Sequence, residues 1–241
     1  IPSDKLSIIA AGGTDWEYVF RVAEKPGKTY EFSGGNHSKE KLENIRLLFN
    51  NEELSINVGD IINLDYVEII ECTSLYMDNK FSKKYADVER KYTIKPSNII
   101  FSSNFKFTRS IYMGTSYVCM MPVLKNYGRY IKFGDSGNVY NTPKPGNTLT
   151  TNKYYNYLGK EKTLSVKIWG DKNPNYKLKA SIDNYDMIDN FKNELKVFYW
   201  DCNIYGNKLY FSKFNNDKCN KIMSETIWNN KVQWELIVNK V

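Results

Sequence analysis

The only histidine of this 241-residue chain, His37, lies in the polar turn Ser33-Gly34-Gly35-Asn36-His37. An imidazole titrates near neutral pH, so it can transfer protons or bind a ligand. The two glycines lack Cβ atoms and would let a ligand approach the backbone closely. We therefore expect a functional site here, with His37 as a catalytic residue and Asn36 as a ligand-binding one. A structural turn with an incidental histidine is the alternative.

Carboxylates and tyrosines elsewhere in the chain could complete such a site. Glycoside hydrolysis uses a pair of carboxylates, whereas β-elimination from a uronate uses Tyr and His with an Arg or Asn. Glu71 and Tyr117 are therefore further candidate catalytic residues. Glu71 belongs to a group of acidic residues that precedes the middle of the chain: Glu31, Glu68, Glu71, Asp87 and Glu89.

Two arginines and two tyrosines are candidate ligand-binding residues. Arg90 and Arg129 could hold an anionic sugar through their guanidinium groups. Tyr76 and Tyr130 could stack on a sugar ring. Sequence spacing alone does not show that these residues meet in space.

The elements that must position these residues are predicted to be strands. Short runs with apolar residues at every second position cover much of the chain, for example 16–23, 67–72, 98–110 and 115–123. Such runs without long helices between them favour an all-β fold, a large antiparallel β-sandwich. We expect only a few short helices, near 39–42, 183–193 and 220–228, and an inward orientation for Val19, Phe105, Phe107, Val118 and Met120.

The chain is predicted to form a single β-sandwich domain over residues 1–241. A stretch rich in Pro, Gly, Asn and Thr at 141–152 is the best candidate for a subdivision. Because the first residue is Ile1, we expect the chain to be part of a longer protein.

Charge and cysteine content exclude several classes of function. The net charge of +7 comes from 34 Lys and Arg against 27 Asp and Glu, spread along the chain, which argues against nucleic-acid binding. No apolar stretch reaches the length of a membrane span, so we expect no membrane insertion. Cys72, Cys119, Cys202 and Cys219 form no C-x-x-C pair, so we expect no metal and no cofactor, and reduced Cys72 and Cys119. Whether Cys202 and Cys219 are bridged is left open.

A longer pattern runs from "YEFSGGNH" through "VEIIECTSLYM" and "DVERKYTI" to "YMGTSYVCMMPV". This order resembles receptor-binding domains of tail fibre and tail spike proteins from phages and prophages of Gram-positive bacteria. The layout is also loosely similar to the β-supersandwich of galactose-mutarotase-like proteins. The phage resemblance implies a homotrimeric component of the virion tail, whose partners are bacterial surface glycan and other tail proteins.

The sequence thus predicts a phage tail receptor-binding domain that recognises bacterial surface polysaccharide. One alternative is a polysaccharide-degrading depolymerase of a tail spike, either a lyase or a glycoside hydrolase. A second is a secreted or surface-bound bacterial carbohydrate-binding protein. Whether the domain is an enzyme is left open.

Overall fold

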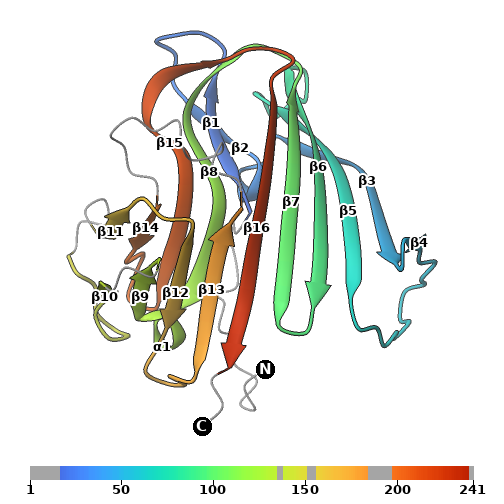
Figure 1. Ribbon diagram of the computed structural model, residues 1–241. Coiled ribbons are helices and arrows are strands. Elements are labelled where there is room, and N and C mark those ends of the chain that lie inside the picture. Colours follow the sequence, from blue (N-terminus) through green and yellow to red (C-terminus); the bar gives the residue numbers. More distant parts are fainter. Residues whose placement is uncertain (1–16, 135–137, 151–155, 184–196, 239–241) are drawn as a thin grey trace.

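Two antiparallel sheets make up the fold (Figure 1). The computed structural model describes residues 17–134, 138–150, 156–183 and 197–238. The smaller sheet has the order β11-β14-β15-β8-β1-β2, and the larger has the order β10-β9-β12-β13-β16-β7-β6-β5-β3-β4. An all-β sandwich, as predicted from the sequence, is confirmed.

The six strands of the smaller sheet are, in chain order, β1 (Val19–Ala23), β2 (Glu31–Ser33), β8 (Ile111–Leu124), β11 (Tyr157–Glu161), β14 (Val197–Trp200) and β15 (Gly206–Ile222). The ten of the larger sheet are β3 (Glu40–Phe49), β4 (Glu52–Glu53), β5 (Val67–Tyr76), β6 (Lys84–Lys95), β7 (Asn98–Phe107), β9 (Tyr130–Phe133), β10 (Val139–Asn141), β12 (Ser165–Trp169), β13 (Tyr176–Ile182) and β16 (Ile227–Val238). Two short helices occur in the described ranges, the 3-10 turn η1 (Gly35–His37) and α1 (Lys125–Gly128).

The strands form because apolar residues alternate with polar ones, so that each strand has one buried face. In β7, Phe101, Phe105 and Phe107 are fully buried, while Asn104 and Lys106 between them are exposed. Phe105 packs against Phe20 of β1 with 5.1 Å between ring centroids. Aromatic contacts of this kind join the two sheets.

The smaller sheet is buried on both faces. Val19 and Met120 pack with Phe198 and Tyr210 in a second apolar cluster, separate from the main core. We expected both residues to point into the core between the sheets, as Phe105, Phe107 and Val118 do, and for Val19 and Met120 that was wrong. Alternation alone does not distinguish the faces of a strand that is covered on both sides.

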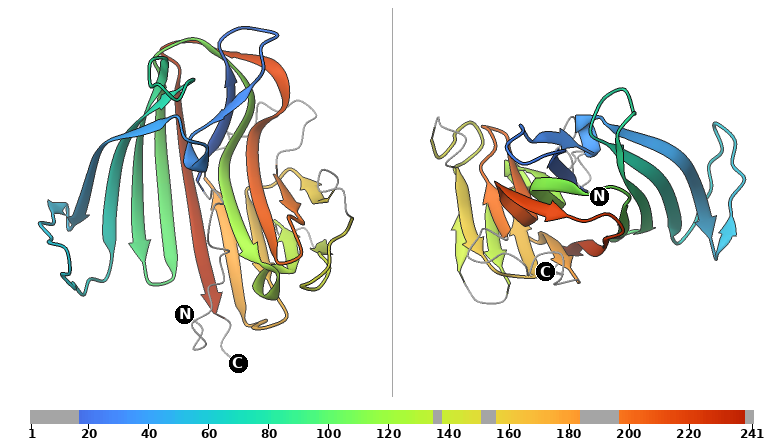
Figure 2. Two further views of the ribbon diagram at one scale, coloured as in Figure 1. Left: turned by 180° about the vertical axis from the view of Figure 1, so that it is seen from behind. Right: turned by 90° about the horizontal axis from the view of Figure 1, so that it is seen from above.

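The larger sheet extends beyond the smaller one on the side of β3, β4 and β5 (Figure 2). Leu42 and Ile45 of β3 are 53% and 46% exposed. By strand register they lie on the same face as Glu71 and Thr73 of β5, which is the face turned toward the core. This part of the concave sheet is therefore open to solvent.

The helices expected near 39–42 and 220–228 are not present: the first segment is mostly strand, and the second is the end of one strand, a turn and the start of the next. The first segment begins β3, whose Glu40 pairs with Leu75, and the second lies in the hairpin of β15 and β16. Cross-strand pairing overrides a weak local helical pattern in both places. The expected helix at 183–193 lies almost wholly outside the described residues.

Strands from before and after the 141–152 stretch pair with each other in both sheets: β8 with β15, and β9 with β12.

No helix among the described residues is long and apolar enough to cross a membrane.

Candidate functional site

Arg90 is the centre of a polar cluster on the inner face of β6. Its Nη1 lies 2.8 Å from Glu17 Oε2. Its Nη2 lies 3.2 Å from Glu40 Oε1 and 3.0 Å from Glu71 Oε2. The guanidinium carbon is 5.7 Å from the centre of the Tyr18 ring. One cation thus contacts three carboxylates, each from a different part of the chain.

Glu40 connects this cluster to the glycine turn. Its Oε2 accepts a hydrogen bond from the backbone N–H of Gly35 (3.2 Å), and its Oε1 accepts from Tyr18 Oη (2.7 Å) and Thr73 Oγ1 (2.6 Å). Gly34 has φ of +88°, and a Cβ there would lie 3.0 Å from the Tyr18 ring. The turn therefore needs glycine so that its backbone can pack over Tyr18 and reach Glu40.

Glu17 lies in an environment that shifts its pKa. Burial raises the pKa of Glu17 above its ordinary value, against the attraction of Arg90 and the hydrogen bond from Tyr92. The negative charges of Glu71 and Glu40 act in the same direction as burial. Burial also raises the pKa of Tyr92, so its phenol stays protonated and donates to Glu17.

We refer to Glu17, Tyr18, Glu40, Glu71, Thr73, Arg90 and Tyr92 as the Arg90 cluster. Its members differ in exposure: the side chains of Arg90 and Glu40 are 9% and 11% exposed, and those of Glu17 and Glu71 are 17% and 23% exposed. The cluster is thus largely buried and reaches solvent chiefly through Glu71. Glu71 is also the member that lies directly opposite Ile45 on the open face.

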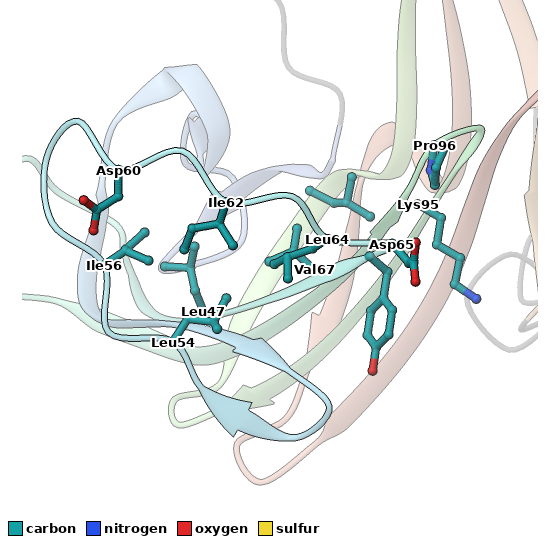
Figure 3. A pocket seen from close by; sticks show the side chains of 12 residues that line it. Leu47, Leu54, Ile56, Asp60, Ile62, Leu64, Asp65, Val67, Lys95 and Pro96 are labelled. Atoms are coloured by element: carbon teal, nitrogen blue, oxygen red, sulfur yellow. The ribbon is translucent and has the colours of Figure 1, made fainter.

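An aliphatic surface continues from Glu71 along the open face. Leu47 and Ile69 pair across β3 and β5 on the same face as Glu71 and Ile45. Beyond them, the loop between β4 and β5 covers a groove of about 440 Å³. Figure 3 shows the aliphatic side chains of the loop and of the strands pointing toward one another in this groove: Leu47, Leu54, Ile56, Ile62, Leu64 and Val67.

His37 lies on a different side of the glycine turn. Its ring stacks on Phe32 of β2, with 4.5 Å between centroids and 19° between planes. Phe32 in turn carries the Arg21 guanidinium at 5.1 Å. The turn therefore contacts the Arg90 cluster through its backbone, while His37 is exposed and packs on the edge strand. The side chain of Asn36 lies outside what the structure describes.

Of the other expected site residues, Arg90 and Glu71 meet, and the remaining ones are dispersed. Tyr76 is buried, with its ring edge-on to Phe81 at 5.1 Å. Tyr117 packs on Tyr210 and Phe198, on the outer face of the smaller sheet. The sandwich therefore separates Tyr117 from Glu71.

Arg129 and Tyr130 lie at the opposite end of the larger sheet, around Asp171. Asp171 Oδ2 is 2.7 Å from Arg129 Nη1, and Asp171 Oδ1 accepts from Tyr130 Oη at 2.8 Å. Tyr130 stacks on Trp169 of the neighbouring strand, and Lys177 lies 5.5 Å from the Trp169 ring. Arg129 and Lys177 thus lie on either side of the stacked Tyr130 and Trp169 rings. The group extends along the surface of the sheet across β9, β12 and β13.

Glu17 and Glu40 were missed as site residues. Glu17 precedes the first strand and lies 73 residues from Arg90 in the sequence, so no local pattern connects them. Glu68, Asp87 and Glu89, which were considered, alternate with the inward residues and lie on the outer face of the larger sheet. Knowledge of the strand register would have separated the acidic residues of the inner face from those of the outer face.

In the described parts of the chain, no group of three or more His, Cys, Asp or Glu side chains is arranged to hold a metal ion. Cys72 and Cys119 are free thiols. Burial raises the pKa of the Cys119 thiol. The side chain of Cys219, and so its pairing with Cys202, lies outside the description.

Comparison with solved structures shows the same fold at very low sequence identity. An α-galactosidase from Lactobacillus brevis matches over 91% of this chain and 29% of its own, with a TM-score of 0.52 and 9% identity. A GH36 α-galactosidase from Geobacillus stearothermophilus matches over 91% and 30%, with a TM-score of 0.51 and 8% identity. A putative mutarotase from Salmonella typhimurium matches over 91% of this chain and 72% of its own, with a TM-score of 0.46 and 9% identity.

The conclusion that the fold is shared rests on the two α-galactosidases. At this low identity the likeness concerns the fold and nothing further. The chain spans about 30% of their length. No family model matches the sequence. No curated protein matches it either.

Proposed function

We propose that this chain is a carbohydrate-binding domain whose site is the open concave face beside the Arg90 cluster. The observation that carries the proposal is the fixed group of carboxylates at the margin where the larger sheet extends beyond the smaller one. Glu71 is held by Arg90 at 3.0 Å and still reaches solvent. The α-galactosidases that share this fold are named for their action on a sugar.

The chemistry of the surface suits a saccharide. Carboxylate oxygens accept hydrogen bonds from sugar hydroxyls, and charge-assisted bonds of this kind are stronger than neutral ones. Leu42 and Ile45 present aliphatic surface beside Glu71, against which the C–H face of a sugar ring can pack. A few fixed polar groups on a concave, mostly apolar surface are typical of ligand sites.

A narrower version of the proposal is that the glycan belongs to a bacterial surface and that the chain is part of a phage tail. Its support is the sequence pattern between Tyr30 and Phe133. A homotrimer and a location in the virion tail follow from that resemblance. Binding of the purified domain to cell walls of Gram-positive hosts, together with detection of the protein in purified virions, would test this version.

Glycoside hydrolysis is the second candidate function, and the environment of Glu17 favours it. A glycosidase needs one carboxyl group that stays protonated and a second that is ionised. Burial raises the pKa of Glu17, and Glu71 contacts the same guanidinium from the solvent side. Release of reducing ends from a bound polysaccharide, abolished in Glu17→Gln, would establish this activity.

Binding to an immobilised set of bacterial and plant glycans tests the main proposal. Glu71→Ala should weaken binding of any glycan that is captured by about tenfold or more, because a charge-assisted bond is lost. Glu89→Ala is the matched control, since Glu89 lies opposite Cys72 on the outer face of the same two strands. Equal binding by both variants, or capture of no glycan, would refute the site.

A further inference from the structure

The Arg90 cluster carries an excess of negative charge. Among the groups in direct contact with Arg90, three carboxylates face one guanidinium, so the formal charge is −2 when all are ionised. A proton on Glu17 would leave −1. The protein as a whole has a net charge of +7, so the cluster is a local acidic site on a basic molecule.

This arrangement changes the role that the sequence suggested for Arg90. We expected its guanidinium to hold an anionic sugar, but both of its terminal nitrogens contact carboxylates of the protein. An incoming uronate would meet the like charges of Glu71 and Glu40. The site therefore disfavours anionic ligands.

Buried polar atoms without partners lie beside the carboxylates. Ser103 of β7 lies opposite Arg90 of β6 and on the same face of the sheet. Ser103 is 3% exposed, and its Oγ has no hydrogen-bond partner in the described part of the chain. The Nε of Arg90 is likewise unpartnered. Buried polar groups are nearly always hydrogen-bonded, so these two atoms indicate a further polar group at this position.

We propose that the site takes a saccharide that carries a protonated primary amine. The ammonium group would lie against Glu71, the most exposed carboxylate of the cluster, and a hydroxyl would reach toward Ser103 and the Nε of Arg90. This inference rests on the proposed carbohydrate-binding function and specifies its ligand. N-acetylation of the amine removes the charge and two of its donors, so it should remove the preference.

Calorimetric titration at pH 6 with three tetrasaccharides tests the inference: β-1,4-linked glucosamine, the same tetramer fully N-acetylated, and galacturonate. The free-amine tetramer should bind about tenfold or more tightly than the acetylated one, and galacturonate should bind least. Glu71→Gln keeps the shape and removes the charge, so it should reduce the ratio of the two glucosamine affinities to below about threefold. Glu89→Gln loses the same charge on the outer face and should keep the ratio.

The outcomes separate this inference from the function on which it rests. If the acetylated tetramer binds as tightly as the free amine and Glu71→Gln weakens both, a carbohydrate site is present and the amine preference is refuted. If galacturonate binds best, the charge argument is refuted. If neither glucosamine tetramer binds and the glycan set also captures nothing, both proposals fail. Thermal unfolding of each variant confirms that the fold is intact.

Discussion

A fully buried ion pair shows how single residues hold the loops around the smaller sheet. Lys125 and Asp201 have no exposed side-chain surface, and their charged atoms are 2.5 Å apart. Asp201 also accepts a hydrogen bond from the backbone of Leu149 at 2.6 Å, and Lys125 donates to the carbonyl of Asn147 at 2.5 Å. The pair therefore fixes the 147–149 segment against α1 and the end of β14.

Lys125→Met should destabilise the protein by about 3–5 kcal/mol, because it leaves the Asp201 carboxylate buried without its cation. Urea unfolding measures this change. Lys106→Met is the control: Lys106 pairs with Glu225 at 3.4 Å, and both side chains are more than half exposed. Such a surface pair contributes less than about 1 kcal/mol. Similar losses in the two variants would contradict the role of the buried pair.

Glu17 should make the stability of the protein depend on pH. Its pKa is raised in the folded protein, chiefly by burial, so folding favours the protonated form. Its contribution is therefore fully present below the pKa of the unfolded chain and is lost as pH rises through the folded pKa. Glu17→Gln mimics the protonated group and does not titrate.

The wild type should consequently lose stability relative to Glu17→Gln as pH rises from about 4 to 7, by about 1.4 kcal/mol for each unit of pKa shift. Chemical denaturation of both proteins across this range measures the difference, and effects of other titrating groups largely cancel. A wild type that gains stability relative to the variant over the same interval would show that Arg90 dominates and that the pKa is lowered.

At the scale of elements, the glycine turn positions Glu40 at the start of β3. Gly34→Ala should cost about 1–3 kcal/mol, because the position has φ of +88° and the added Cβ meets the Tyr18 ring at 3.0 Å. Gly27→Ala separates the two effects: its φ is +73°, but nothing lies within 4 Å of the added Cβ.

The loss in Gly27→Ala should therefore be the smaller of the two, about 1 kcal/mol, from backbone strain alone. Thermal or urea unfolding measures both variants. Equal losses would mean that contact with Tyr18 is unimportant and that the turn is not tied to the cluster by packing.

The strands were predictable because alternation is a local property. Phe105 and Phe107 of β7 are buried as their spacing indicated. The segment from Lys39 to Leu42 was mistaken for a helix, since what makes it a strand is its pairing with β5, some thirty residues away. Local sequence carries no information about that partner.

Residue type alone predicted site residues correctly only where the strand register also places them next to each other. Arg90 and Glu71 were both expected to be functional, and they lie opposite each other in β6 and β5. Tyr117 and Tyr130 have side chains suited to such a site, but the fold places them on other surfaces. Which face a residue occupies depends on bulges and on the layering of the sheets, which spacing does not give.

At the scale of the whole molecule, the unequal size of the two sheets creates the open face. Six strands cover only part of a sheet of ten, and β3 and the outer part of β5 lie beyond the covered region (Figure 2). Exposed Leu42 and Ile45 beside fixed carboxylates make this the surface on which our account depends.

The most direct test of that account is a backbone-amide NMR titration with a glycan that the domain binds. We predict that the largest shift changes map to β3, β5 and β6 around Ile45, Glu71 and Arg90. Smaller changes should follow along the groove of Figure 3. Changes concentrated instead around Tyr130 and Trp169, at the far end of the larger sheet, would contradict the central claim.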